Sequence, residues 1–127
     1  MEIIHSDHAP AALGPYSQAI RTGGLVFCSG QLGLDPATGK MAGDTVEAQA
    51  EQACRNVESV LIAAGLSLTD VVKTTCFLAD MGDFAAFNGV YAKYFTGKPA
   101  RSCFAVKGLP SGGLCEIEVV AAVPLED

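Results

Sequence analysis

Three charged residues near the end of the chain have the types and spacing to bind a small carboxylate and to handle water. Arg101 opens an apolar run, and its planar guanidinium can hold a carboxylate through two hydrogen bonds. Glu116 and Glu118 alternate with apolar residues, so both carboxylates face the same side of the strand expected there. The same pattern also fits a charged strand edge and two solvated glutamates. These residues alone therefore identify no reaction.

Motifs of nucleotide binding and nucleophilic catalysis do not fit this sequence. The stretch from Gly33 resembles a phosphate-binding loop but has Met41 where Ser or Thr would hold Mg²⁺. Neither G-x-G-x-x-G nor the nucleophile elbow G-x-S-x-G occurs. The two histidines, His5 and His8, flank a short strand candidate and a loop, which favours neither a metal site nor a Ser-His-Asp triad. We therefore expect no metal and no cofactor.

The composition excludes further classes. The net charge is -6 and the pI is near 4.7, which disfavours a nucleic-acid binder and an anionic membrane as partner. The longest uncharged stretch, residues 22–34, contains several glycines and is shorter than the roughly 20 apolar residues that span a bilayer. The first five residues lack the features of a secretory signal. We therefore expect a cytoplasmic protein.

The 5 cysteines are widely spaced, form no C-x-x-C motif and sit in apolar runs. In that setting free cysteine packs as a small hydrophobe, so we expect reduced structural thiols rather than a disulfide framework or a zinc site. The residues concerned are Cys28, Cys54, Cys76, Cys103 and Cys115.

Two amphipathic segments predict helices. Residues 46–64 carry an apolar stripe at intervals of three and four, with Asp44 and Glu47 resembling a capping box and Gly65 a C-terminal stop. Residues 83–95 carry an aromatic stripe, which we interpret as core packing.

Short β-favouring runs occur on both sides of these helices. Strands or extended segments are expected at residues 3–4, 16–21, 25–30, 71–78, 102–106 and 114–123. This order predicts one α+β domain over residues 1–127, with two helices on one face of a mixed sheet. Several strands are apolar on both faces, so we expect other subunits to bury the second face.

Several segments, in order along essentially the whole chain, resemble the Rid family of enamine/imine deaminases (RidA or YjgF-type). These segments are Ala11 to Gln18, Ser29-Gly30-Gln31, Asp70 to Thr75 with Phe77, Asp83-Phe84 through Asn88 and Tyr91, Pro99 to Cys103, and Glu116-Ile117-Glu118. Two departures are Cys115, where the family usually has an aliphatic residue, and the Gly112-Gly113 loop, which is more flexible than in many relatives and could change substrate access.

The resemblance implies a fold like chorismate mutase, with a six-stranded mixed sheet and two helices. It implies a homotrimer with a central barrel and sites between subunits. The implied reaction is cofactor-independent hydrolysis of 2-enamines and 2-imines, such as 2-aminoacrylate and 2-iminopropionate, to 2-keto acids and ammonia. The physiological imine is not specified by the sequence.

The resemblance also implies roles for individual residues. Arg101 would bind the substrate carboxylate and Glu116 would position the attacking water. Cys103 would shape the pocket and offer backbone hydrogen bonds rather than act as a nucleophile. The backbone of Ser29 and Gly30 would receive the departing nitrogen. The implied substrate-binding set is Tyr16, Ser29, Gly30, Asn88, Arg101 and Cys103.

Two other functions fit the same resemblance. One is a non-catalytic trimeric binder of 2-keto acids or similar carboxylates, in which Glu116 would be dispensable. The other is an endoribonuclease or translation inhibitor, an activity attributed to some relatives. The acidic charge and the absence of a histidine general-base pair disfavour the second function.

Overall fold

A computed structural model describes residues 1–125, and this part of the chain contains six strands, two α-helices and three short 3-10 helices. The strands are β1 (Glu2–Ile4), β2 (Ala19–Thr22), β3 (Leu25–Leu32), β4 (Val71–Leu78), β5 (Ala100–Ala105) and β6 (Cys115–Ala122). The helices are α1 (Val46–Ala63), α2 (Phe84–Tyr94), η1 (Leu68–Asp70), η2 (Met81–Asp83) and η3 (Pro110–Gly112). The sequence predicted all the strands and α-helices to within a few residues, but not the 3-10 turns. The last two residues of the predicted domain, 126 and 127, lie outside the described part.

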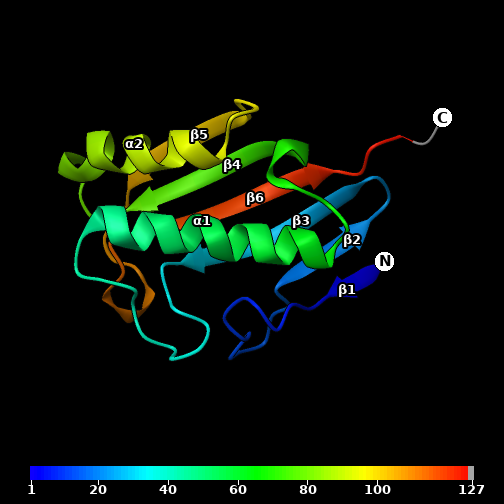
Figure 1. The fold of residues 1–127 in the computed structure, drawn as a ribbon, viewed down its shortest axis with the longest axis horizontal. Coiled ribbons are helices and arrows are strands. Elements are labelled where there is room, and N and C mark those ends of the chain that lie inside the picture. Colours follow the sequence, from blue (N-terminus) through cyan, green and yellow to red (C-terminus); the bar gives the residue numbers. More distant parts are fainter. Residues whose placement is uncertain (126–127) are drawn as a thin grey trace.

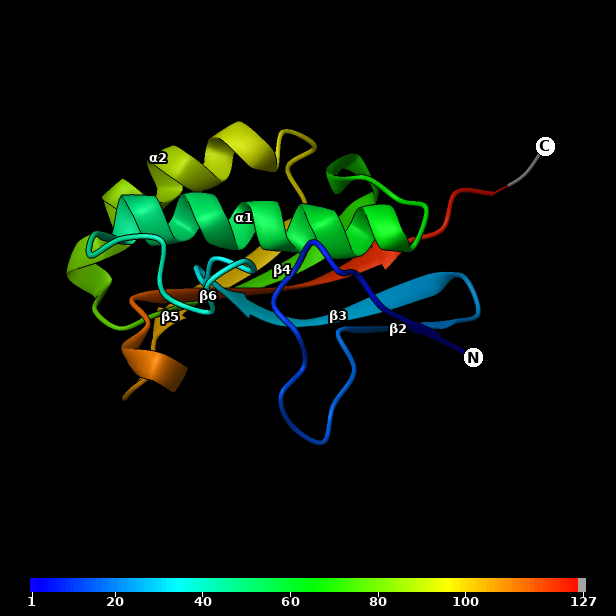
Figure 2. The same cartoon turned by 60° about the horizontal axis from the view of Figure 1, so that its bottom comes forward.

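The strands form one sheet in the order β1-β2-β3-β6-β4-β5 (Figure 1). Strands β4 and β5 are parallel, and the other neighbouring pairs of the described sheet are antiparallel. Both α-helices cover the same face of this sheet, as Figure 2 shows. The predicted mixed α+β sheet is therefore confirmed. The central barrel concerns neighbouring subunits and stays a prediction.

Helix α1 begins one residue later than the expected capping box requires. Its N-cap is Thr45, whose side chain accepts a hydrogen bond from the Ala48 backbone N–H at 3.2 Å. Asp44 therefore lies before the cap and Glu47 at the second helical position, so the predicted box between them is wrong. The C-terminal stop is confirmed, because Gly65 has φ +77° and Leu66 N donates to the Leu61 carbonyl at 2.8 Å.

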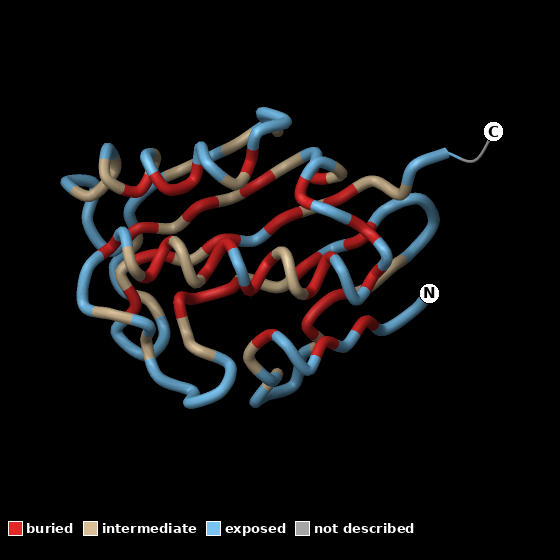
Figure 3. The backbone as a smooth tube through the Cα atoms, in the orientation of Figure 1, coloured by how far each residue is buried: buried red, intermediate tan, exposed pale blue. Residues whose placement is uncertain are grey.

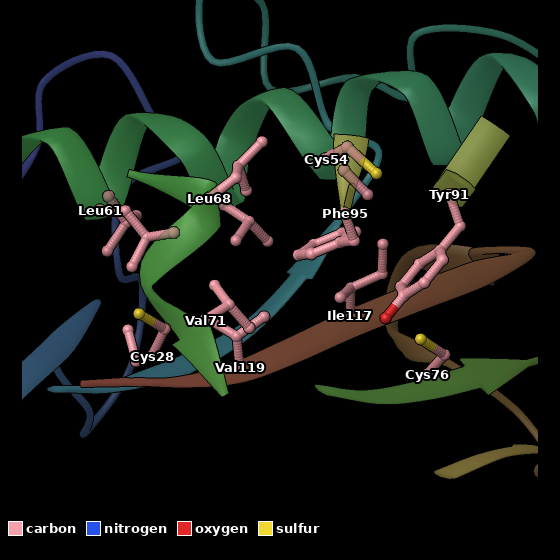
Figure 4. Close-up of a cluster of buried hydrophobic side chains, with 14 of the residues drawn as sticks. Cys28, Cys54, Leu61, Leu68, Val71, Cys76, Tyr91, Phe95, Ile117 and Val119 are labelled. Atoms are coloured by element: carbon pink, nitrogen blue, oxygen red, sulfur yellow. The ribbon is translucent and has the colours of Figure 1, made fainter. Parts of the chain in front are cut away.

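The core lies between the two helices and the sheet (Figures 3 and 4). It contains the whole predicted apolar stripe of α1 and the central residues of α2. Four cysteines are buried in the described core and Cys103 is half-buried, which confirms the prediction of apolar surroundings. Among residues 1–125, neither α-helix is long and apolar enough to cross a membrane.

The opposite face of the sheet carries large apolar side chains that nothing in the described chain covers. Phe27 is 45% exposed and Phe104 44% exposed. Phe104 packs edge-on against Phe77 at a centroid distance of 5.5 Å. A soluble monomer rarely presents such an apolar face, so the expectation of a subunit interface here gains support but stays a prediction.

Candidate active site

Four of the expected site residues line one pocket, which we call the Glu116 pocket. It has a volume of about 500 Å³, and residues of the loop before β2 and of the η3 segment line it together with residues of β3 and β6. Figure 2 shows this loop and η3 projecting from the sheet face away from the helices. The lining residues used below are Tyr16, Ser29, Gly30, Glu116 and Glu118.

A bulge in the sheet allows the backbone to approach the Glu116 carboxyl group. The β3–β6 register shifts between Cys28 and Gln31, so Ser29 and Gly30 fall at the irregularity. A Cβ atom on Gly30 would lie 2.8 Å from the Cδ and Oε2 atoms of Glu116. Glycine at this position therefore lets the carboxyl group rest directly against the β3 backbone.

Buried hydrogen bonds hold the loop that carries Tyr16. The Gln18 side chain accepts from Ser6 N at 2.7 Å and donates to the carbonyls of Ser6 and Pro10 at 3.1 and 2.9 Å. Ser29 adds two bonds, since its N–H donates to the Gln18 carbonyl at 2.9 Å and its hydroxyl to the Ser17 carbonyl at 2.7 Å. The loop and the bulge thus form one connected wall, with the exposed Tyr16 ring at its rim.

The environment of Glu116 favours its neutral form. Burial raises the pKa of this carboxyl group above its ordinary value, and the nearby Glu118 carboxylate raises it further. Glu118 is exposed and lies on the same face of β6. A carboxyl group with a raised pKa is a stronger base when ionised, which suits the abstraction of a proton from water.

Arg101 and Asn88 line a second pocket of about 520 Å³, which we call the Arg101 pocket. The Arg101 Nη1 atom donates to Asn88 Oδ1 at 2.6 Å. Its guanidinium carbon lies 4.8 Å from the centroid of the Tyr91 ring and 5.5 Å from that of Phe84. Within residues 1–125 no carboxylate lies within ion-pair distance of Arg101. The guanidinium is thus oriented and available to an anionic ligand.

The Tyr91 ring lines the Arg101 pocket and the Phe84 ring lies near the guanidinium, two contacts that the sequence interpretation missed. The aromatic stripe was assigned to the core, and Tyr91 is indeed buried (Figure 4). Its hydroxyl lies 2.8 Å from the Thr74 hydroxyl. The same ring also supports the guanidinium. The signal was available, because Phe84, Asn88 and Tyr91 are spaced by four and three residues and so share one helix face.

Cys103 lies behind Arg101 on the same face of β5 and is half-buried. Among the described residues it lines neither the Glu116 pocket nor the Arg101 pocket. Within one chain, its expected place in the substrate pocket is therefore not reproduced.

The two pockets lie on opposite faces of the sheet. Arg101 is paired with Thr74 of β4, which is buried under the helices, whereas Glu116 is paired with Phe77, three residues further along β4. An odd number of residues along a strand reverses the face, and three residues span about 10 Å. One chain therefore does not bring Arg101 and Glu116 together.

Nothing in the described residues provides a cluster for a metal ion, since no group of three or more His, Cys, Asp or Glu side chains is suitably placed. His5 instead forms an exposed pair with Asp7 at 2.8 Å. The polar groups that line the two pockets are thus one guanidinium, the Lys98 ammonium, three side-chain amides, two carboxyl groups, hydroxyls and backbone groups.

Comparisons with known proteins place this geometry in context. The profile of a family described as Endoribonuclease L-PSP matches residues 6–123. A protein from Capra hircus named 2-iminobutanoate/2-iminopropanoate deaminase is 48% identical over 120 residues, which cover 94% of this chain and 88% of that protein.

Two solved structures from E. coli share the fold. The yjgF gene product has a TM-score of 0.91 and 42% identity, covering 96% of this chain and 98% of that chain. TdcF with bound serine has a TM-score of 0.93 and 41% identity, covering 98% and 100% of the two chains.

Proposed function

Because this chain belongs to the Endoribonuclease L-PSP family, which includes YjgF and the Rid proteins, we propose that it hydrolyses 2-enamines and 2-imines to 2-keto acids and ammonia. The name of the similar Capra hircus protein supports this reaction class. Arg101 binds the carboxylate of the imino acid, and Glu116 accepts a proton from the attacking water. These are the catalytic assignments, and 2-iminopropionate has both groups that they require, a carboxylate and an imine carbon.

The reaction needs little beyond positioning and proton transfer. A protonated imine carbon is already electrophilic, so the protein has to hold it beside a water molecule and remove one proton. Ionised Glu116 takes that proton as the C–O bond forms and passes it to the nitrogen. It then removes the proton of the new hydroxyl group as the C=O bond forms and the C–N bond breaks. The departing ammonia takes up this second proton, which restores ionised Glu116. The bulge places the backbone of Ser29 and Gly30 beside Glu116, and a carbonyl oxygen there would accept a hydrogen bond from that nitrogen.

The placement of the two pockets on opposite sheet faces is the observation that carries this proposal. Arg101 and Glu116 serve one substrate only if the Arg101 pocket of one chain meets the Glu116 pocket of another. A cyclic trimer that buries the bare apolar face of the sheet supplies such interfaces. Each interface then holds one site with residues from two chains, among them Asn88 and Cys103 from one subunit and Tyr16 from the other.

An assay with 2-iminopropionate tests the function. The imine is generated in situ by an amino-acid oxidase, and its loss is followed by trapping with semicarbazide. The wild-type protein should accelerate the loss of imine, and Arg101→Ala should lower kcat/KM about 10²–10³-fold, because a charged contact to the substrate carboxylate is lost. Equal activity in wild type and Arg101→Ala would contradict the assignment of Arg101.

Binding without hydrolysis is the second candidate, and it is favoured by the structure of the similar protein TdcF with bound serine. In this case the Arg101 pocket would still bind carboxylates, but Glu116 would be dispensable. Calorimetry with 2-ketobutyrate and the imine assay, each on wild type and Glu116→Gln, separate the two functions. Hydrolysis predicts that Glu116→Gln retains binding and loses turnover, whereas simple binding predicts no turnover in either protein.

A further inference from the structure

Two cysteines face each other across the parallel strands beside Arg101. Cys76 of β4 is paired directly with Cys103 of β5, one same-face position beyond the pair formed by Thr74 and Arg101. Neighbouring strands lie about 4.7–4.9 Å apart, which is within the range of Cα separations of roughly 4.4–6.8 Å found in disulfides. Both side chains point to the helix-covered face, so their sulfur atoms can meet with a small local adjustment.

The two thiols differ in access. Cys103 is half-buried on β5, two residues after Arg101, whereas Cys76 is fully buried on β4, near the Tyr91 ring (Figure 4). Burial raises the pKa of Cys103, and the Arg101 guanidinium and the Cys76 thiol oppose this rise. Burial raises the pKa of Cys76 to about 12. An oxidant from solution therefore meets Cys103 first, with Cys76 placed to react second.

We propose that Cys103 and Cys76 form an oxidative modification site, in which a peroxide converts the two thiols into a disulfide between β4 and β5. In the first step the Cys103 sulfur attacks hydrogen peroxide, the O–O bond breaks, and a sulfenic acid and one water result. In the second step the Cys76 sulfur attacks the sulfenic sulfur, its thiol proton leaves with the hydroxide, and a second water is released. The two thiols together lose two electrons, which reduce the peroxide.

The modification would inactivate the site, an effect that rests on the proposed function. Arg101 and Cys103 are alternate residues of β5, so drawing Cys103 toward β4 displaces the guanidinium from Asn88 and Tyr91. Small displacements of positioning groups cost large factors in rate, so we expect imine hydrolysis to fall about tenfold or more. Reduction of the disulfide by dithiothreitol should restore it.

Peptide mapping tests the chemistry independently of activity. The full chain is treated with hydrogen peroxide, alkylated and digested with trypsin, which places Cys76 alone in residues 74–93 and Cys103 alone in residues 102–107. The expected product is a cross-link between these two peptides that disappears on reduction. It should form faster as the pH rises, since the thiolate of Cys103 is the attacking species.

Two variants complete the test. Cys76→Ala should form no cross-link, and its Cys103 should pass to the sulfinic acid, so dithiothreitol should not restore activity. Cys54→Ala, which also removes a fully buried thiol, should behave like wild type. The proposal is overturned if wild-type Cys103 becomes sulfinic, or stays reduced, without a cross-link. If the cross-link forms but the reduced protein hydrolyses no imine, the proposed function fails and the modification site stands.

Discussion

The Glu116 pocket and the Arg101 pocket position their charged groups by different means. The Glu116 carboxyl group is held by backbone, because it rests against Gly30 at a strand bulge and faces a loop fixed by Gln18. The Arg101 guanidinium is held by side chains of one helix, with Asn88 hydrogen-bonded to it and Tyr91 beneath it. The first arrangement restricts the movement of the Glu116 carboxyl group, and the second leaves the Arg101 guanidinium without an ion-pair partner among the described residues.

This difference fits the two tasks of the proposed imine hydrolysis. A group that moves protons needs a fixed distance to its water, and steric contact with backbone provides that. A group that recognises a carboxylate needs an orientable fork with free donors, and an aromatic support provides that without neutralising the charge. The two pockets should therefore respond differently to substitution, and neither should work without the other.

The largest expected effect comes from recombining the two pockets. Arg101→Ala and Glu116→Gln chains should each be nearly inactive alone. When they are co-expressed in equal amounts, random assortment into the proposed trimers pairs an intact Arg101 pocket with an intact Glu116 pocket at about one quarter of the interfaces. Imine hydrolysis should therefore return to about a quarter of the wild-type rate in the mixture.

A second mixture provides the control for this recombination. Arg101→Ala and Asn88→Ala both damage the Arg101 pocket, so their mixture assembles no pocket with both residues intact and should show only the residual activity of the Asn88→Ala chain. A site formed within one chain would instead leave the Arg101→Ala and Glu116→Gln mixture inactive, and that result would refute the shared site.

The steric contact at the bulge should be sensitive to one methyl group. In Gly30→Ala the new Cβ would lie 2.8 Å from the Glu116 carboxyl group, which must move because it is the flexible end of a side chain. We expect kcat to fall about 10–100-fold with little change in the free energy of unfolding. Gly24→Ala, whose Cβ would meet no atom within 4 Å, is the matched control and should leave kcat unchanged. Equal kcat values in the two variants would contradict steric positioning.

The sequence predicted these pockets unevenly. The alternation around Glu116 correctly placed both glutamates away from the core, because a period of two is a local property of the strand. The position of Arg101 on the opposite face depends on the parallel register between β4 and β5, which pairs two segments that are distant in the sequence. The apolar stripe of α1 predicted its buried face. The cap at Thr45 was missed because Asp44 and Thr45 are adjacent and both are good cap residues, so the residue types alone do not choose between them.

Buried polar residues were the least predictable part of the fold. Asn56 of α1 donates to the carbonyls of Leu32 and Leu34 at 3.0 and 2.8 Å. Gln49 donates to the Gly43 carbonyl at 2.9 Å and accepts from Leu114 N at 2.8 Å. Such residues look like ordinary polar positions on a helix, and only the folded chain brings them to the loops that they fix.

The aromatic support of Arg101 should give a moderate effect that separates stacking from hydrogen bonding. Tyr91→Leu removes the ring and should raise KM for 2-iminopropionate about three- to thirtyfold, the range expected for a lost cation–π contact. Tyr91→Phe keeps the ring but leaves the Thr74 hydroxyl without its partner. It should keep KM near wild type and lower the free energy of unfolding by about 1–2 kcal/mol, measured by urea denaturation. A rise in KM in Tyr91→Phe equal to that in Tyr91→Leu would show that the ring does not support the guanidinium.

The smallest expected effect concerns the pH dependence of the Glu116 pocket. Since burial and then Glu118 raise the pKa of Glu116, the ionised base is lost as the pH falls through that raised value, and kcat falls with it. Glu118→Gln removes the like charge, so the acid limb of the kcat profile should move to lower pH. The contribution of Glu116 to the free energy of unfolding changes with pH in the opposite direction. Because the pKa is raised in the folded state, this contribution is fully present below the pKa of the unfolded chain and is lost as the pH rises through the pKa of the folded chain. Glu47→Gln, an exposed carboxyl group at the start of α1, removes the same charge outside both pockets and should leave the acid limb in place. An acid limb that moves equally in both variants would attribute the shift to net charge rather than to the contact between Glu116 and Glu118.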